Sequence, residues 1–375
     1  MSVDGGVQSP DVASRPERIA VVHDWLTGMR GGEQILEAIL GLLPAADLFT
    51  LFHFPGSVSP AIEARTIRTS FLQPVAARVA DYRKLLPLFP AAIRRFDLSG
   101  YDLIVSSSHC VAKGVAAHGK PHLSYCHTPM RYIWDRFDDY FPSSRPLTRG
   151  AMSMIAPALR RWDVRTAGEV TRFLANSTFV RQRISEHYGR DADVVHPFVD
   201  QAFLAAPLVE ERDDYDLVVS ALVPYKLVDL AIDTATATGR PLVVIGGGPL
   251  LEAFRARRAP NVSLLGHVSR DEVIAKMSRA RCLILPGIED FGITPLEAMA
   301  LGTPVVALRG GGALDTIEEG QSGIFFDAPV VESLSQGLSQ LDRQKWDRAA
   351  IRAHAAAFSL AEFGRRFSDA LQRTR

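Results

Sequence analysis

Short apolar segments alternate with segments of helical periodicity along almost the whole chain, and this alternation limits the fold more than any other feature. Apolar segments lie at 19–22, 103–105, 122–125, 173–176, 217–220, 242–245, 262–264, 282–285, 305–307 and 324–326. Strands that are separated by helices in this way form parallel sheets with helices on both faces. The sequence therefore predicts an α/β protein made of doubly wound, Rossmann-like domains.

A chain of 375 residues is too long for one ordinary core and suits two such domains. We place the boundary where an extended segment at 194–200 gives way to a polar run at 210–216. The expected units are a disordered leader at 1–17, a first domain at 18–198, a second at 199–358, and a helix at 359–375 with the option of returning to the first domain. Two such domains that face each other enclose an interdomain cleft lined by the carboxyl ends of both sheets.

Charge and cysteine content argue against several classes of protein. The 42 Lys and Arg residues balance 42 Asp and Glu residues, so we expect no nucleic-acid partner. Cys110, Cys126 and Cys282 form no CxxC pair and predict buried thiols. Asp191 and Asp193 precede a strand, so we interpret them as a solvated turn and expect no metal site. Because no eighteen consecutive residues are apolar, we predict a cytoplasmic protein without a spanning helix.

Two glutamates eight positions apart mark the most informative segment. Glu289 follows the apolar strand 282–285, and Glu297 falls in the first turn of the next helix, for which Thr294 and Pro295 provide an N-cap and a first-turn proline. At the carboxyl end of a parallel strand, such a junction offers backbone N–H groups and carboxylates to one crevice. This arrangement suits a polyhydroxylated anion such as a nucleotide sugar. Alternatively, Glu297 only completes a capping box with Thr294.

Three other segments offer groups for an anionic ligand. Gly31 and Gly32 lie between the first strand and a helix, whose N-terminus supplies N–H donors and positive partial charge, although a plain tight turn also uses glycine. Lys226 follows the strand at 217–220, where an ammonium group can neutralise a departing diphosphate. The run 309–312 contains three glycines that could form an anion-binding nest, whereas we interpret glycines 246–248 as structural.

Several polar side chains follow strands of the first domain. His127 closes the strand at 122–125, and Arg131 and Tyr132 lie close behind it in the chain. These groups suit a sugar or an anionic acceptor, although a single histidine after a strand is often only structural. His109 is a second candidate, and Asp24, directly after the first strand, joins the candidates for acceptor binding.

Taken together, these residues resemble the retaining GT-B glycosyltransferases of family four over almost the whole chain. The segment 289–306 matches that family's two-glutamate motif, including Phe-Gly and the continuation Pro-Leu-Glu-Ala-Met-Ala-Leu-Gly-Thr-Pro-Val-Val. Segments 106–114, 125–132 and 221–226 are similar to a subgroup assigned to mannosyl transfer in polysaccharide and lipopolysaccharide assembly. The chain departs from the family at Ala221, where arginine is common, and from the subgroup at Leu227.

The resemblance implies a role for each candidate residue. Glu297 would bind the ribose hydroxyls and Glu289 the hydroxyls of the donor sugar. Lys226 would stabilise the leaving diphosphate, and His127 would lie at the reaction centre, so that the implied catalytic set is His127, Lys226 and Glu289. The other implied donor contacts are Gly31, Gly32 and the backbone N–H groups of Phe291, Gly292, Ile293 and Thr294.

The resemblance also implies the reaction. We expect a retaining, metal-independent hexosyltransferase without a cofactor, which uses the nucleotide sugar GDP-mannose as donor and a glycan or lipid-linked acceptor, by front-face attack. The first domain would bind the acceptor and the second the nucleotide sugar. A UDP-sugar-dependent transferase, a hydrolase or epimerase, and a catalytically weak sugar-nucleotide-binding subunit remain as alternatives.

A basic, amphipathic segment at 81–98 suggests where a lipid-linked acceptor would meet the protein. It interleaves arginine and lysine with apolar residues and is interrupted by two prolines. Such a segment could rest on an anionic membrane surface, which would make the protein peripheral on the inner face of the cytoplasmic membrane. The alternative is a solvated helix face over the first core. Arg160, Arg161 and Arg165 form a second basic patch with the same two interpretations.

Overall fold

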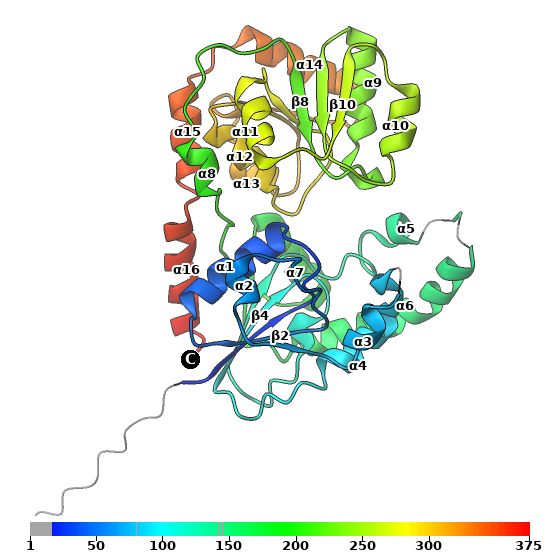
Figure 1. The fold of residues 1–375 in the computed structure, drawn as a ribbon, viewed down its shortest axis with the longest axis vertical. Coiled ribbons are helices and arrows are strands. Elements are labelled where there is room, and N and C mark those ends of the chain that lie inside the picture. The colour runs from blue at the N-terminus through cyan, green and yellow to red at the C-terminus, as the bar shows by residue number, and fades with distance from the viewer. Residues whose placement is uncertain (1–16, 80, 142, 145) are drawn as a thin grey trace, which may run out of the picture.

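The computed structural model describes residues 17–375 except residues 80, 142 and 145. Figure 1 shows two α/β domains, one above the other. The first contains a parallel sheet of order β3-β2-β1-β4-β5-β6-β7, and the second a parallel sheet of order β10-β9-β8-β11-β12-β13. Both orders reverse direction in the middle of the sheet, between β1 and β4 and between β8 and β11. The predicted pair of doubly wound, Rossmann-like domains is confirmed.

The strands of the first domain are buried most completely in the centre of the sheet and least at its edges. Their bounds are β1 (Ile19–His23), β2 (Asp47–Thr50), β3 (Ile67–Thr69), β4 (Leu103–Ser108), β5 (His122–Cys126), β6 (Arg172–Ala175) and β7 (Ala192–Val194). All residues of β4 and β5 are buried, as expected of strands that helices cover on both faces. The interpretation of 191–193 as a turn is wrong, because Asp193 lies in the edge strand β7, where it pairs with Arg172.

Helices of the first domain cover both faces of this sheet (Figure 1). They are α1 (Gly31–Leu42), α2 (Pro60–Glu63), α3 (Gln73–Ala76), α4 (Phe89–Ile93), α5 (Phe137–Tyr140), α6 (Pro146–Ala167) and α7 (Thr178–Tyr188), with 3₁₀ helices η1 (Tyr82–Leu88) and η2 (Ala112–Gly114). The predicted amphipathic segment 81–98 forms η1 and α4, and its side chains Leu86, Phe89 and Ile93 are buried in the first core.

The second domain repeats the pattern with β8 (Asp216–Val219), β9 (Leu242–Ile245), β10 (Val262–Gly266), β11 (Leu283–Leu285), β12 (Val305–Leu308) and β13 (Gly323–Phe326). Its helices are α8 (Gln201–Ala205), η3 (Pro224–Lys226), α9 (Val228–Thr238), α10 (Leu251–Arg257), α11 (Arg270–Arg279), α12 (Ile293–Ala300), α13 (Ala313–Thr316), α14 (Val331–Arg343) and α15 (Arg348–Ala356).

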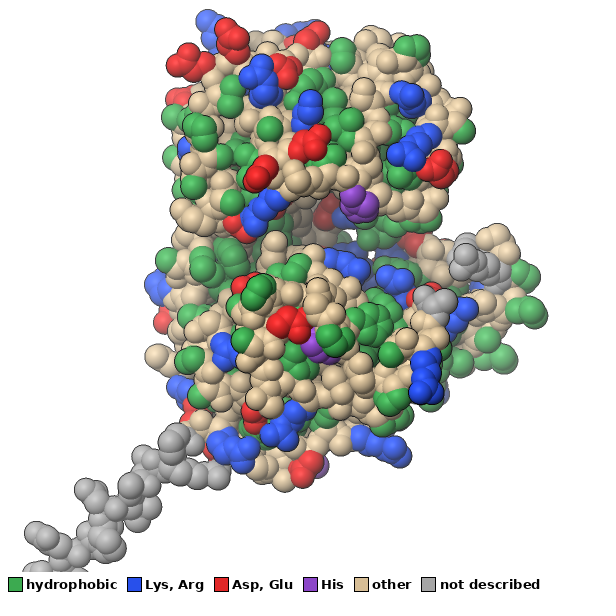
Figure 2. All heavy atoms as spheres, viewed as in Figure 1, with side chains coloured by type: hydrophobic (Ala, Val, Ile, Leu, Met, Phe, Trp, Pro, Cys, Tyr) green, Lys and Arg blue, Asp and Glu red, His purple; other side chains and the backbone are tan. Residues whose placement is uncertain are grey.

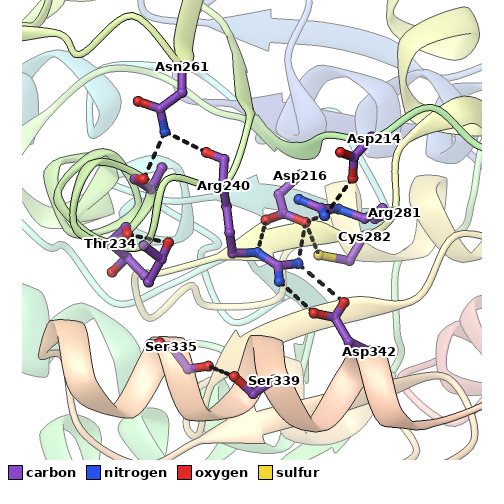
Figure 3. Close-up of polar contacts among 12 residues, drawn as sticks. Asp214, Asp216, Thr234, Arg240, Asn261, Arg281, Cys282, Ser335, Ser339 and Asp342 are labelled. Atoms are coloured by element: carbon purple, nitrogen blue, oxygen red, sulfur yellow. Dashed lines mark hydrogen bonds and ion pairs between the residues drawn. The ribbon is translucent and has the colours of Figure 1, made fainter.

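A cluster of charged side chains lies at the amino ends of the strands of the second sheet and connects them to α14. Figure 3 shows Arg240 between Asp216, at the start of β8, and Asp342 on α14. Its guanidinium group lies 2.8 Å from the buried Asp216 carboxylate and 2.5 Å from Asp342. These hydrogen-bonded ion pairs compensate the buried negative charge of Asp216. Because this cluster lies at the amino ends of the strands, the carboxyl ends remain free for the side chains of a site.

The chain passes between the domains twice, and the two crossings are hydrogen-bonded to each other. The backbone N–H of Val199 donates to the carbonyl oxygen of Phe358 over 2.9 Å. After the second crossing, α16 (Leu360–Gln372) lies along the first domain (Figure 1). Its side chains Phe363, Phe367 and Leu371 pack into the same core as α1. Within the described residues, no helix is both long and apolar enough to cross a membrane.

Candidate active site between the two domains

The first turns of α1 and α12 face each other where the two domains meet. Figure 2 shows a hollow between the domains, with basic, acidic and histidine side chains around its opening. The two helix starts come close, because a Cβ atom added to Gly31 would lie 3.0 Å from the Cδ1 atom of Ile293. Both residues begin their helices. Helix N-termini carry unpaired N–H groups and positive partial charge. The region where α1 and α12 begin therefore suits phosphate groups that are held from both domains.

The start of α12 differs from the sequence prediction. The helix begins at Ile293, and Gly292 takes the N-cap position with a φ of 84°, a left-handed conformation that favours glycine. Thr294 is therefore the second helical residue, so the prediction that it is the N-cap is wrong. No described side chain caps this helix. The glycine lets the loop turn sharply and leaves the N–H groups of the first turn unoccupied by any described side chain.

Glu297 also does not take part in a capping box. Its carboxyl group accepts no hydrogen bond from any residue that the structure describes, although Arg270 and Asp200 are near enough to influence its charge. Burial raises the pKa of Glu297 to about 7. Because α12 begins at Ile293, Glu297 is its fifth residue and lies two positions further into the helix than the sequence predicted. A carboxyl group that is half-buried and unsatisfied there suits a ligand that brings its own hydrogen-bond donors.

Lys226 and Glu289 form an ion pair at the switch point of the second sheet. Lys226 follows β8 and Glu289 follows β11, and these two strands are neighbours. The Nζ atom of Lys226 lies 2.5 Å from Oε1 of Glu289, and both side chains are largely buried. Gly287 allows this approach, because a Cβ atom there would lie 2.7 Å from the carbonyl oxygen of Tyr225. The structure thus brings these two predicted site residues together.

The glycine run after β12 supports the Glu289 loop and does not form an anion nest. The N–H of Gly312 donates to the carbonyl oxygen of Glu289 over 2.9 Å. Cβ atoms added to Gly311 and Gly312 would lie 2.2 Å from the oxygen of Glu289 and 2.3 Å from Cα of Phe291. Arg309 pairs with carboxylates of Glu319 and Asp327, away from this loop. The nest interpretation is therefore wrong, and these glycines fix the position of the loop that carries Glu289 instead.

Three histidines gather at the switch point of the first sheet. His23 ends β1, His109 follows β4 and His127 follows β5, and their ring centroids lie 6.0 to 6.5 Å apart. The Nε2 atom of His127 lies 2.8 Å from Oγ of Ser107. A Cβ atom added to Gly32 would lie 3.9 Å from the His127 ring, which places this ring beneath the first turn of α1. Burial lowers the pKa of His127 well below its ordinary value, so its ring is neutral.

Asp24 has a structural role, which corrects its prediction as an acceptor-binding residue. Its side chain is fully buried. Its carboxylate accepts the N–H groups of the four consecutive residues 109–112 over 2.6 to 2.9 Å, and the Nδ1 atom of His109 lies 3.1 Å from it. With both oxygens occupied in this way, Asp24 shapes the turn after β4. His109 stays half-exposed beside it and remains a candidate for substrate contact.

Arg131 and Tyr132 also make contacts within the protein. Arg131 forms an ion pair with Asp290 of the second domain, which holds the pKa of its guanidinium above its ordinary value although burial opposes this. The Tyr132 ring packs on Tyr140 with centroids 4.4 Å apart. Arg131 therefore joins the domains, and its predicted contact with an acceptor is not what the structure shows.

Asp290 is the centre of the interdomain contact. Besides Arg131, the Nη1 atom of Arg183 on α7 lies 2.8 Å from its carboxylate, and Oγ of Ser177 donates to its carbonyl oxygen over 2.5 Å. A second contact joins Asp315 on α13 to the N–H of Thr178, over 2.6 Å. Sequence reasoning missed Asp290 and Arg183, although Asp290 stands directly beside Glu289. Within the described residues, no group of His, Cys, Asp and Glu has the geometry of a metal site.

Comparison with known proteins identifies the class to which this fold and site belong. The model of Glycosyltransferase Family 4 matches residues 35–203, and the model of Glycosyl transferases group 1 matches residues 200–357. With two parallel-sheet domains around an interdomain site, these matches make the chain a glycosyltransferase of the GT-B class. More particularly, this chain contains a Glycosyltransferase Family 4 domain followed by a Glycosyl transferases group 1 domain.

Curated relatives with described activities are similar over about half of the chain. A GDP-mannose-dependent alpha-(1-6)-phosphatidylinositol monomannoside mannosyltransferase of Mycobacterium tuberculosis is 29% identical over 229 residues, which is 50% of this chain and 60% of the relative. A D-inositol 3-phosphate glycosyltransferase of Mycobacterium avium is 30% identical over 222 residues, 52% of each protein. The chain thus aligns with only part of the length of these relatives.

Solved structures are similar over nearly the whole chain. Anabaena Alr3699/HepE in complex with UDP has a TM-score of 0.67 at 18% identity, over 95% of this chain and all of that chain. The lipopolysaccharide outer core galactosyltransferase WaaB has a TM-score of 0.65 at 17% identity, over 96% of this chain and all of the other. At these identities the likeness shows the fold.

Proposed function

We propose that this glycosyltransferase transfers mannose from GDP-mannose, with retention and without a metal ion, to a glycan or lipid-linked acceptor in cell-surface polysaccharide assembly. The observation that carries the proposal is the Lys226–Glu289 pair beside two facing helix N-termini, because it combines groups for sugar hydroxyls with groups for a diphosphate. The mannosyltransferase relatives support the donor. A UDP-sugar is the alternative, since a neighbouring structure of the same fold holds UDP.

In this proposal each residue acts on a defined part of the donor. The N–H groups at Gly31 and at the start of α12 hold the diphosphate, Glu297 accepts hydrogen bonds from the ribose, and Glu289 accepts them from the sugar. The acceptor oxygen attacks C1 of the sugar on the face from which the phosphate departs, and its proton passes to the departing phosphate oxygen. Negative charge grows on the nucleoside diphosphate during this step, and Lys226 stabilises it.

The donor is tested by thermal denaturation with GDP, UDP and ADP, followed by incubation with the corresponding sugar nucleotides. A ligand that binds only the folded protein raises its melting temperature. We expect GDP to give the largest shift, and GDP-mannose with an acceptor to give an α-linked product in NMR spectra. A new sugar nucleotide formed without an acceptor would indicate an epimerase. A melting shift without any product would indicate a binding subunit.

The metal-free mechanism is tested with a chelator. We expect transfer to continue at an unchanged rate in excess EDTA, because Lys226 and the helix N-termini supply the positive charge that a metal ion provides elsewhere. Loss of activity in EDTA, restored by a divalent cation, would refute this part of the proposal.

A peripheral position on the inner face of the cytoplasmic membrane is the corresponding proposal for a lipid-linked acceptor. Phe71 and Leu88 are 47% and 48% exposed, and the guanidinium group of Arg95 lies over the Phe71 ring at 5.0 Å. Exposed Arg83 and Lys84 add positive charge to this surface. In the second patch, Arg160 is committed to the carbonyl oxygen of Ile133 at 2.6 Å. Co-sedimentation with anionic but not neutral liposomes is expected, and equal recovery in both supernatants would contradict it.

A further inference from the structure

Four polar side chains form a line that ends at His127. Glu33 lies in the first turn of α1, His23 at the end of β1 and Ser107 in β4. The Oε1 atom of Glu33 lies 4.0 Å from Nε2 of His23, whose Nδ1 lies 3.1 Å from Oγ of Ser107. The same Ser107 oxygen lies 2.8 Å from Nε2 of His127. His23 and Ser107 are fully buried, so solvent does not compete for these contacts.

The negative charge on Glu33 determines which atoms along this line donate hydrogen bonds and which accept them. Burial raises the pKa of Glu33, but His23, His109 and a backbone N–H together leave the pKa below its ordinary value, so the group is a carboxylate. A carboxylate only accepts hydrogen bonds. The Nε2 atom of His23 has no hydrogen-bond partner within the described chain, and a hydrogen there is attracted by Glu33 whereas a lone pair is repelled. His23 then carries its hydrogen on Nε2 and has a lone pair on Nδ1.

The hydrogen positions on Ser107 and His127 follow from this tautomer of His23. The lone pair on Nδ1 of His23 accepts the single hydrogen of the Ser107 hydroxyl, so the Ser107 oxygen becomes the acceptor for His127. We propose that Glu33, His23 and Ser107 are positioning residues that hold His127 in the tautomer with its hydrogen on Nε2. The Nδ1 atom of His127 is then an acceptor, and it selects a substrate hydroxyl that donates a hydrogen bond.

His109 provides an internal comparison, because the same reasoning gives it the opposite tautomer. Its Nδ1 atom lies 3.1 Å from the carboxylate of Asp24, which can only accept. Its hydrogen therefore lies on Nδ1. Two histidines of one site thus differ in the nitrogen that carries the hydrogen, which a single spectrum can show.

The proposed contact between Nδ1 of His127 and a substrate hydroxyl rests on the proposed function, whereas the proposed tautomer of His127 does not. The first experiment is therefore a long-range ¹H–¹⁵N correlation spectrum of the full chain with ¹⁵N-labelled histidine and without substrate. We expect His127 to show a protonated Nε2 and an unprotonated Nδ1, and His109 to show the reverse. If His23 instead carried two hydrogens, Ser107 would donate to His127 and place the hydrogen on Nδ1. That spectrum would overturn the proposal.

Substitutions at Ser107 are controlled by a matched pair in the same strands. Ser106 precedes Ser107 in β4, and its Oγ atom lies 2.8 Å from Nε2 of His122, the first residue of β5. Ser107→Ala should move the ¹⁵N signals of His127 towards a mixture of tautomers, and Ser107→Thr should restore them. Ser106→Ala should leave His127 unchanged. An unchanged His127 in Ser107→Ala would also overturn the proposal.

Kinetics then test whether the tautomer matters for transfer. In Ser107→Ala and His23→Phe we expect kcat to fall at least about tenfold, with KM for the donor within about threefold of the original, because the hydrogen bond from a substrate hydroxyl to His127 is misdirected while the diphosphate contacts remain. Ser106→Ala should keep its kcat. Equal kcat in both serine variants would refute the substrate role. Absence of any transfer by the unmodified protein would refute the proposed function and leave the spectroscopic result standing.

Discussion

The burial of Glu297 makes the stability of the protein depend on pH. Its pKa is about 7 in the folded protein, above the ordinary value of 4.5, because burial disfavours the charged form. A raised pKa means that the folded state holds the proton more tightly than the unfolded chain. Proton binding by Glu297 therefore stabilises the folded protein fully below about pH 4.5, and this stabilisation is lost as pH rises to about 7. For a half-buried group, the resulting change in the free energy of unfolding is on the order of 2 kcal/mol.

Glu297→Gln should remove this pH dependence. We expect the variant to be more stable than the original protein at pH 8, by on the order of 2 kcal/mol, and about equally stable near pH 4.5. Urea denaturation at both pH values measures this, with the exposed Glu332→Gln as the matched control. Identical pH profiles for Glu297→Gln and the original protein would contradict it.

Lys226 should affect turnover more than donor binding. In the proposed function the ammonium group of Lys226 faces the growing negative charge, so we expect Lys226→Ala to lower kcat by about 10²-fold or more. The affinity for GDP should change much less, because the two helix N-termini still hold the phosphates. Steady-state kinetics and calorimetry measure the two effects, and the exposed Lys345→Ala is the control. Equal losses in kcat and in GDP affinity would contradict this assignment.

The positions of individual candidate site residues could be predicted from the sequence where they depend on the strand directly before them in the chain. Glu289 and Lys226 each follow an apolar strand, and their meeting follows from the order of the sheet. Asp24 was assigned wrongly because its partners lie about 85 residues away in the chain. His23 was missed for a similar reason, since Ser107 joins it to His127 only after β1 and β4 have paired.

At the scale of elements, the site depends on loops that approach each other closely. Gly312→Ala would place a Cβ atom 2.3 Å from Cα of Phe291, a backbone atom that can move only with the whole loop. We expect a loss of about 1–3 kcal/mol in unfolding free energy. We also expect a strong loss of activity, because Glu289 lies in the displaced loop.

The control for this substitution is another glycine-to-alanine change. Gly41 lies within α1, and a Cβ atom there would meet no described atom within 4 Å. Gly41→Ala should therefore stabilise the protein by about 0.5–1 kcal/mol. Urea denaturation and activity assays on both variants separate the two cases. Full activity in Gly312→Ala would show that the glycine does not position Glu289.

The strands that were predicted best are those buried on both faces. The runs predicted for β5, β9 and β13 match the observed strands to within one residue, because buried strands of a parallel sheet are rich in apolar residues. The run predicted for β4 ends three residues early, because the strand continues through the buried serines 106–108. The edge strand β7 has three residues and a polar centre, so its sequence carries little strand signal. The first residue of α12 was misplaced by two positions, because the conformation of Gly292 decides where the helix begins.

At the scale of the whole molecule, Asp290 holds the two domains together. Asp290→Asn leaves the buried Arg183 with one carboxylate fewer and removes the ion pair with Arg131. Breaking a buried pair typically costs about 3–5 kcal/mol. We expect a loss of this order in unfolding free energy, together with a larger radius of gyration in X-ray scattering because the domains separate.

The control is an exposed ion pair in the second domain. Asp327 pairs with Arg309 and is 76% exposed, so Asp327→Asn should change the stability by less than about 1 kcal/mol and leave the scattering unchanged. A radius of gyration in Asp290→Asn equal to that of the control would show that other contacts, such as Asp315 with Thr178, suffice to hold the domains.

The position of α16 affects how the protein is made. Phe363, Phe367 and Leu371 complete the core of the first domain, yet the ribosome translates them after the entire second domain. The nascent first domain must therefore wait with the apolar face of α1 uncovered while more than a hundred further residues emerge, although domains generally fold in the order of their synthesis. Newly made chains should need protection by a chaperone until translation of the last helix is complete.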